Sequence, residues 1–121
     1  AFDVSAWQAM YRWVNDTVPF AGAAFRQWIV EFYQDNRLTR NMLEMDGRPV
    51  RLGGIGCPVL NIAASRDQIA PRETTSVITK RVGSRDASEI IVEGGHVGIV
   101  VGRSASQNLW PKVGTWLREH D

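Results

Sequence analysis

Two short apolar runs in the second half of the sequence constrain the fold most strongly. "CPVLNIAA" (57–64) and "SEIIVEGG" (88–95) each have the composition of a strand buried on both faces. A helical stretch (72–82) lies between them, and a second helical pattern (104–120) follows. This strand–helix–strand–helix order favours two parallel strands with helices packed against them. The sequence therefore predicts an α/β fold from residue 54 onward.

The first 53 residues have a different pattern. Apolar side chains recur at helical spacing in "SAWQAMYRWVND" and "AAFRQWIVEFYQDN", which predicts two amphipathic helices. The dipeptide Asp46-Gly47 is typical of a two-residue hairpin turn, so we expect a short hairpin around it. The chain is thus expected to divide into a cap or lid region (1–53) and a βαβα region (54–121).

Composition excludes several classes of protein. The 121 residues are enough for one core. The 14 basic and 13 acidic residues nearly cancel, which disfavours a nucleic-acid binder. No apolar run approaches the roughly 20 residues that cross a bilayer, so no membrane span is expected. The single cysteine, Cys57, cannot form an internal disulfide, which is consistent with a cytoplasmic protein.

Two polar residues follow the two predicted strands directly. Asp67 comes after the first strand and His96 after the second. Ligands of such sheets bind beyond the carboxyl ends of the strands, and both residues fall at that edge. A carboxylate that accepts the Nδ1 proton of a histidine suits a catalytic triad. Gly94, Gly95 and Gly98 allow the backbone to turn sharply around His96. The sequence therefore predicts Asp67 and His96 as a catalytic pair.

Other interpretations of these residues remain open. Asp67 has the residue type of a turn former or helix cap, and His96 of a structural histidine in a glycine turn. Two other acids are weaker candidates for the acid that pairs with His96. Asp86 precedes the second strand, and Glu93 is expected within it. His120, next to the end of the sequence, is expected to be solvated.

No nucleophile is expected in this chain. A triad on such a sheet usually has its nucleophile in a G-x-S-x-G type turn upstream of the acid and the histidine. Cys57 is followed by Pro58, which has no N–H for an oxyanion hole, so Cys57 is interpreted as a buried structural thiol. Ser104 follows the histidine and lacks the second glycine. The order of motifs favours a part of a longer protein with the nucleophile upstream.

Several segments together resemble the carboxyl-terminal part of poly(3-hydroxyalkanoate) synthases. They are "FYQDNRL", "GRPVRL" leading into "CPVLNIAASRD", and "GGHVG" followed by a closing tryptophan–leucine helix. The resemblance implies the carboxyl-terminal half of an α/β-hydrolase fold, preceded by helical cap segments. It also implies an acyltransferase that polymerises (R)-3-hydroxyacyl-coenzyme A into polyester and releases coenzyme A. Asp67 and His96 match the acid and histidine of the family's Cys-His-Asp triad, although Gln68 stands where the family often has histidine.

The resemblance also implies the ligands and partners. The coenzyme A thioester is the substrate, and no metal or bound cofactor is expected. Expected partners are the polyester chain, the remainder of the same enzyme, and a second copy or a second synthase subunit. The location is cytoplasmic or at the polyester granule surface. The aromatic helix faces of the cap either line a channel for an acyl chain or pack in a core, and packing is the simpler explanation. No residue is nominated for contact with coenzyme A, and the isolated chain is expected to be inactive.

Two further hypotheses stay open. The first is an ester hydrolase on the same fold, an esterase or a polyester depolymerase with a serine nucleophile upstream. The second is a noncatalytic module that binds a polyester granule or a partner through its apolar helices. The missing nucleophile separates the two enzyme classes, since a cysteine indicates the synthase and a serine usually indicates the hydrolase.

Overall fold

The computed structural model of the protein describes residues 4–121. The chain divides into two compact units, Ala1–Asn36 and Arg37–Asp121. The hairpin around Asp46-Gly47 therefore groups with the second unit. The expected division into a cap or lid region (1–53) and a βαβα region (54–121) stays a prediction.

The first unit contains the two predicted helices. Helix α1 spans Val4–Asn15, and α2 spans Gly22–Gln27 and continues into a wider π-helical segment, Trp28–Gln34. Phe20, Phe25 and Trp28 contact one another edge-on, with ring centroids 5.9 to 6.2 Å apart. None of the described residues 4–36 is buried, so these aromatic faces are not enclosed in a core within this unit.

The second unit begins with the predicted hairpin. Strands β1 (Leu43–Met45) and β2 (Arg48–Val50) pair in antiparallel fashion. The two turn residues, Asp46 and Gly47, have φ values of 52° and 69°. Two consecutive left-handed residues are what a type I′ turn requires, and such a turn matches the twist of the strands. The hairpin prediction is confirmed.

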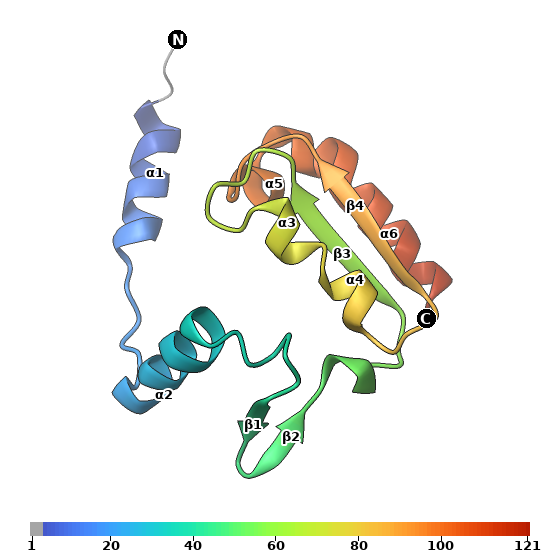
Figure 1. Ribbon diagram of the computed structural model, residues 1–121. Coiled ribbons are helices and arrows are strands. Elements are labelled where there is room, and N and C mark those ends of the chain that lie inside the picture. Colours follow the sequence, from blue (N-terminus) through green and yellow to red (C-terminus); the bar gives the residue numbers. More distant parts are fainter. Residues whose placement is uncertain (1–3) are drawn as a thin grey trace. The chain divides into compact units, whose positions relative to one another are not determined.

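A parallel two-stranded sheet forms the centre of the second unit. Strands β3 (Val59–Ala64) and β4 (Ala87–Val92) pair in register, from Val59 opposite Ala87 to Ala64 opposite Val92. Both arrowheads in Figure 1 point the same way, so the loops that follow the two strands leave from one edge. The structure confirms an α/β arrangement with a small parallel sheet.

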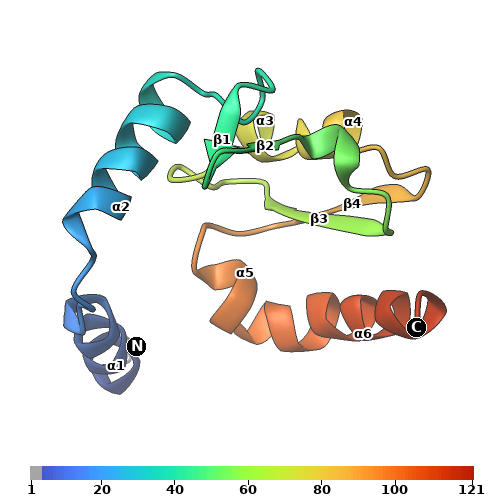
Figure 2. The same cartoon turned by 90° about the horizontal axis from the view of Figure 1, so that it is seen from below.

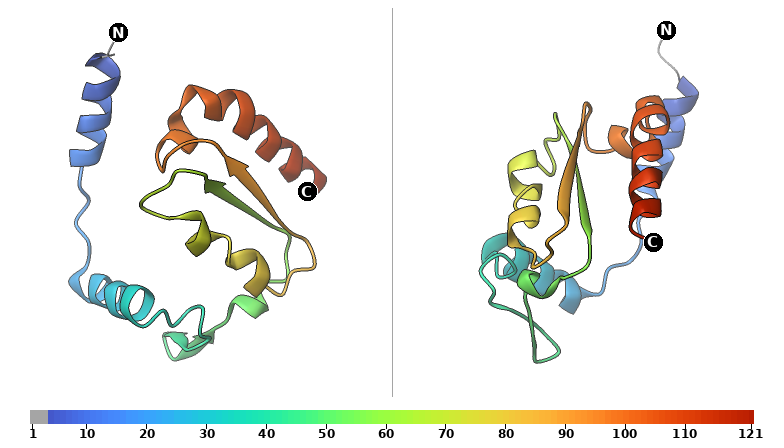
Figure 3. Two further views of the ribbon diagram at one scale, coloured as in Figure 1. Left: turned by 45° about the horizontal axis from the view of Figure 1, so that its top comes forward. Right: turned by 90° about the vertical axis from the view of Figure 1, so that its right-hand side faces the viewer.

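Helices cover both faces of this sheet. Helices α3 (Arg72–Thr75) and α4 (Ile78–Arg81) lie on one face. Helix α5 (Gly98–Val101), a π-helical segment (Ala105–Leu109) and α6 (Trp110–Glu119) lie on the other. Figure 2 and the right-hand view of Figure 3 show these three layers. The buried apolar side chains of this unit are Leu43, Leu52, Ala63, Ala64, Val92, Ala105 and Leu109.

The predicted helix 72–82 is divided in two at Ser76 and Val77. Hydroxyl groups explain part of this break, because threonine side chains bond back to nearby carbonyl groups. Thr74 donates to the Pro71 carbonyl at 2.7 Å, and Thr79 donates to the Ser76 carbonyl at 2.9 Å. Such bonds compete with the regular helical ladder. Pro71 immediately precedes α3, where its missing N–H costs nothing.

One prediction about the start of the sheet is wrong. Cys57, expected as a buried thiol, is exposed. It lies in the bend that precedes β3, two residues before the strand begins.

The 3-10 turn Leu52–Gly54, earlier in the chain, lies very close to Gly83. A Cβ atom on Gly83 would overlap the Gly53 carbonyl oxygen.

Candidate functional site

Asp67 is held rigidly just beyond the end of β3. Its Oδ1 atom accepts hydrogen bonds from the backbone N–H groups of Ile69 and Ala70, each at 2.9 Å. This is the side-chain turn that aspartate commonly forms. The side chain is only 5 % exposed. One carboxylate oxygen is thus used by the loop itself, and Oδ2 is left for another partner.

That partner is His96, which follows β4. The His96 Nδ1 atom lies 2.8 Å from Asp67 Oδ2. The imidazole is 46 % exposed, so it is accessible on one side while the acid behind it is enclosed. The structure therefore brings together the two residues that the sequence nominated. An Nδ1 atom engaged by the acid leaves Nε2 for a reacting group.

Backbone pairing extends past both strands and fixes the two loops relative to each other. The Ser65 N–H donates to the Val92 carbonyl at 2.9 Å, and the Arg66 N–H donates to the Gly94 carbonyl at 3.0 Å. Gly94 has a φ of +155°, a conformation that side-chain-bearing residues rarely adopt. The site is thus an extension of the sheet rather than a contact between two independent loops.

The electrostatics of the pair suit a histidine that acts as a base. The backbone N–H of Ala70, the His96 side chain and the backbone N–H of Ile69 together lower the pKa of the Asp67 carboxyl group. Asp67 therefore stays ionised at neutral pH. An ionised acceptor at Nδ1 favours the tautomer that carries its proton there, so that Nε2 is free to accept one.

The competing acids lie elsewhere. Asp86 precedes β4, at the opposite edge of the sheet from the carboxyl ends of the strands. Glu93 lies directly after β4 rather than within it, and it pairs with Arg66 at 3.0 Å on the surface. The carboxylate partner of His96 is Asp67.

The expectation that His120 is solvated is wrong. Its side chain is 18 % exposed and stacks on Trp116, with ring centroids 4.1 Å apart. Its Nε2 atom lies 2.8 Å from Asp86 Oδ2, and its Nδ1 atom lies 2.6 Å from the Trp116 carbonyl oxygen. Asp86 and His120 are 34 residues apart, and no local pattern in the sequence signals this second His–Asp pair.

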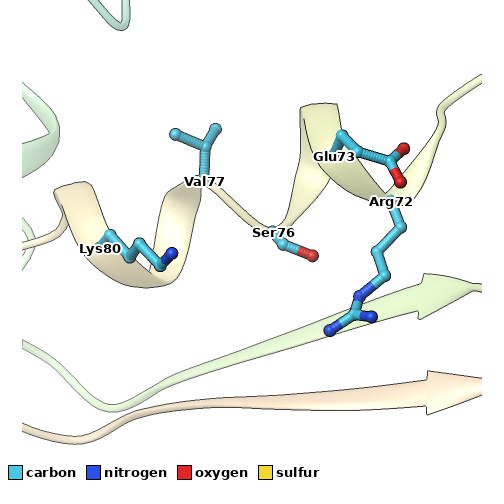
Figure 4. A pocket seen from close by; sticks show the side chains of 5 residues that line it. All are labelled: Arg72, Glu73, Ser76, Val77 and Lys80. Atoms are coloured by element: carbon cyan, nitrogen blue, oxygen red, sulfur yellow. The ribbon is translucent and has the colours of Figure 1, made fainter.

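A pocket of about 350 Å³ lies along α3 and α4, away from the His–Asp pair (Figure 4). In Figure 4 the Arg72 side chain extends toward the strands, and Lys80 lies at the other end of the row. The Arg72 guanidinium already pairs with Glu89 at 3.1 Å, and Glu89 in turn accepts a hydrogen bond from Asn61 at 2.8 Å. Arg72 is therefore part of a polar network between a helix and the sheet, and we assign it no ligand.

Within residues 4–121, which the structure describes, no group of three His, Cys, Asp or Glu side chains is placed to hold a metal ion. In the same residues, no helix combines the length and the apolar character that crossing a membrane requires.

The chain is similar to several curated poly(3-hydroxyalkanoate) polymerases. The chain is 37 % identical over 110 residues to the poly(3-hydroxyalkanoate) polymerase subunit PhaC of Allochromatium vinosum. It is 36 % and 34 % identical to the proteins of that name from Haloarcula marismortui and Thiocystis violacea. Each match covers 91 % of this chain but only 31 %, 23 % and 31 % of the respective relative. The chain thus spans about a third or less of these relatives. No family model matches the chain, and no solved structure gives a significant match.

Proposed function

The chain belongs to the poly(3-hydroxyalkanoate) polymerase family, and from this we propose that it supplies the acid and the base of the family's catalytic triad. Asp67 is the acid and His96 is the base. The nucleophile is a cysteine in a part of the polymerase outside these residues. The reaction is the transfer of (R)-3-hydroxyacyl groups from coenzyme A to a growing polyester.

One observation supports this proposal most directly. The 2.8 Å contact between Asp67 Oδ2 and His96 Nδ1 joins an enclosed acid to an accessible imidazole at the carboxyl edge of a parallel sheet. That edge is where α/β sheets bind ligands. The arrangement orients the ring, favours one tautomer and leaves Nε2 free for a partner, as a triad histidine requires.

The proposed chemistry uses His96 twice. First, Nε2 takes the proton of the cysteine thiol, and the thiolate attacks the thioester carbonyl carbon. The bond to coenzyme A sulfur breaks, and the imidazolium returns its proton to the departing thiolate. Second, Nε2 takes the proton of a hydroxyl group, whose oxygen attacks the enzyme-bound acyl group. The new ester bond forms, and the cysteine thiolate leaves and is reprotonated. Asp67 stabilises the imidazolium in both steps.

The proposal extends to the fold and the surroundings of the chain. The parallel sheet and its flanking helices form the carboxyl-terminal half of an α/β-hydrolase fold, and residues 1–53 belong to its cap. The isolated chain is inactive because it lacks the nucleophile. No metal or bound cofactor takes part. The working partners are hydroxyacyl-coenzyme A, the polyester, the remainder of the enzyme and a second copy or subunit. The enzyme acts in the cytoplasm or at the polyester granule surface.

The decisive experiment compares two histidine variants of the complete polymerase. The assay measures release of coenzyme A thiol from (R)-3-hydroxybutyryl-coenzyme A. We expect His96→Ala to lower turnover by at least about 100-fold, since it removes a general base. His120→Gln is the matched control, because His120 also pairs with an aspartate but lies at the other end of β4, and it should retain turnover.

Two results would contradict the proposal. Unchanged turnover in His96→Ala would remove His96 from the chemistry altogether. Hydrolysis of simple esters or of polyester, without release of coenzyme A from the thioester, would instead favour a hydrolase with a serine nucleophile.

A further inference from the structure

Helix α5 follows the candidate base almost directly. His96 is separated from Gly98, the first residue of α5, by Val97 alone. Helix α5 has four residues, and a single turn of helix does not hold itself in water. The last carbonyl groups of any helix also lack partners within the helix. The position of α5 therefore depends on contacts with other parts of the chain.

One such contact comes from Trp110. Its indole Nε1–H donates a hydrogen bond of 3.1 Å to the carbonyl oxygen of Val100 in α5. Trp110 is the first residue of α6, and the residue before it, Leu109, is 2 % exposed. Val100 and Val101 are 51 % and 66 % exposed, so their own side chains do little to anchor α5. The indole, whose residue is itself 44 % exposed, thus links the start of α6 to α5.

A second set of contacts connects α5 to the histidine loop. The Ile99 N–H donates to the Gly95 carbonyl at 3.2 Å, directly before His96. A Cβ atom on Gly94 would lie 3.4 Å from Ile99 Cγ2, so the two segments are already close. A displacement of α5 is therefore transmitted to Gly94 and Gly95, which precede His96, and through Val97, which follows it.

We propose that Trp110 is a positioning residue for His96. It touches no reacting atom. Its hydrogen bond to Val100 holds α5 in place, and α5 holds the loop that directs the imidazole toward its reaction partner. This inference rests on the proposed function of His96, and it adds a residue that the Asp67–His96 contact alone does not identify.

The test replaces Trp110 with Phe in the complete polymerase, which removes the N–H donor and keeps an aromatic ring. Loss of one neutral hydrogen bond corresponds to a factor of roughly 2 to 12, so we expect kcat to fall by about that factor. KM for hydroxyacyl-coenzyme A should stay the same, and the acidic limb of the pH–rate profile should move. Trp116→Phe is the matched control. Trp116 is in the same helix but stacks on His120, so both kcat and the pH profile should be retained.

A second substitution separates the hydrogen bond from the packing of the ring. β-(3-Benzothienyl)alanine at position 110 has the shape of tryptophan but carries sulfur in place of the N–H. It should reproduce the kcat loss and the shifted pH profile of Trp110→Phe. A wild-type pH profile and kcat in this isosteric variant would overturn the positioning role. If His96→Ala itself kept full turnover, the proposed function would fail instead, so the two failures are distinguishable.

Discussion

His120 Nε2 lies 2.8 Å from Asp86 Oδ2 while its Nδ1 lies 2.6 Å from the Trp116 carbonyl oxygen. Both partners are acceptors, but a neutral imidazole carries only one N–H. An imidazolium satisfies both bonds. The Trp116 carbonyl and, after it, the Asp86 carboxylate raise the pKa of His120 accordingly. The position at the end of α6 also favours a cation.

This pair predicts a pH-dependent contribution to stability. Because the folded-state pKa of His120 is raised, the contribution is complete below the unfolded-state pKa of about 6.5. This contribution to stability is lost as the pH rises through the folded-state pKa of His120. His120→Gln in the complete polymerase should therefore lower Tm more at pH 6 than at pH 9, as measured by thermal unfolding at both pH values. An equal drop in Tm at the two pH values would show that His120 is not charged in the folded protein.

Asp67→Asn should remove activity through the tautomer of His96. The amide oxygen can still accept the two backbone N–H groups, so the loop should keep its shape. Its NH₂ group then faces Nδ1 and favours the tautomer with the proton on Nε2, which cannot act as a base. Such a change in a triad costs about 10⁴-fold in kcat. Steady-state kinetics of the complete enzyme provide the measurement.

Asp86→Asn is the control for that experiment, since it alters the other His–Asp pair. It should leave kcat within a few-fold of wild type. A comparable loss of kcat in Asp67→Asn and Asp86→Asn would mean that the effect of the Asp67 substitution is not specific to the candidate site.

Gly83→Ala should destabilise the protein through its backbone contact with the 52–54 turn. A methyl group there overlaps the Gly53 carbonyl oxygen, and backbone cannot yield as a flexible side chain can. Forced overpacking typically costs about 1–3 kcal/mol of the free energy of unfolding. Gly56→Ala serves as the control, because a Cβ atom at Gly56 meets nothing within 4 Å. Urea unfolding of each variant measures the difference, and equal stability of the two would contradict the close approach.

Leu109→Ala should be among the most damaging apolar substitutions. Leu109, the last residue of the π-helical segment before α6, is 2 % exposed, and truncation of a buried leucine costs about 2–5 kcal/mol. Leu117→Ala, in α6 at 57 % exposure, should cost far less. Similar losses of unfolding free energy in both variants would mean that Leu109 and Leu117 are not buried to the different extents seen in this structure.

The features that the sequence predicts well are those governed by local rules. The Asp46-Gly47 turn follows from the left-handed conformations that this dipeptide tolerates. The parallel pairing of β3 and β4 follows from apolar runs separated by a helix, and it places Asp67 and His96 at one edge. Apolar periodicity also predicts α1 and α2.

The features that the sequence does not predict depend on tertiary contacts. "GIVV" has glycine and β-branched residues, which disfavour a helix, yet it forms α5 with the help of Trp110. The environment of His120 is set by Asp86, 34 residues away. Cys57 is apolar enough for a core, but the strand begins two residues later and leaves it in an exposed bend.

The register of β3 against β4 has a consequence for how the enzyme can be assayed. Bonds from Ser65 to Val92 and from Arg66 to Gly94 continue the register to the edge of the site. A slip of one residue moves one strand by about 3.3 Å, which separates Asp67 from His96 beyond hydrogen-bonding distance. With the roles proposed for Asp67 and His96, molecules with a slipped sheet should be inactive even when they are compact. The specific activity of a refolded sample then measures the fraction of molecules whose strands are correctly aligned.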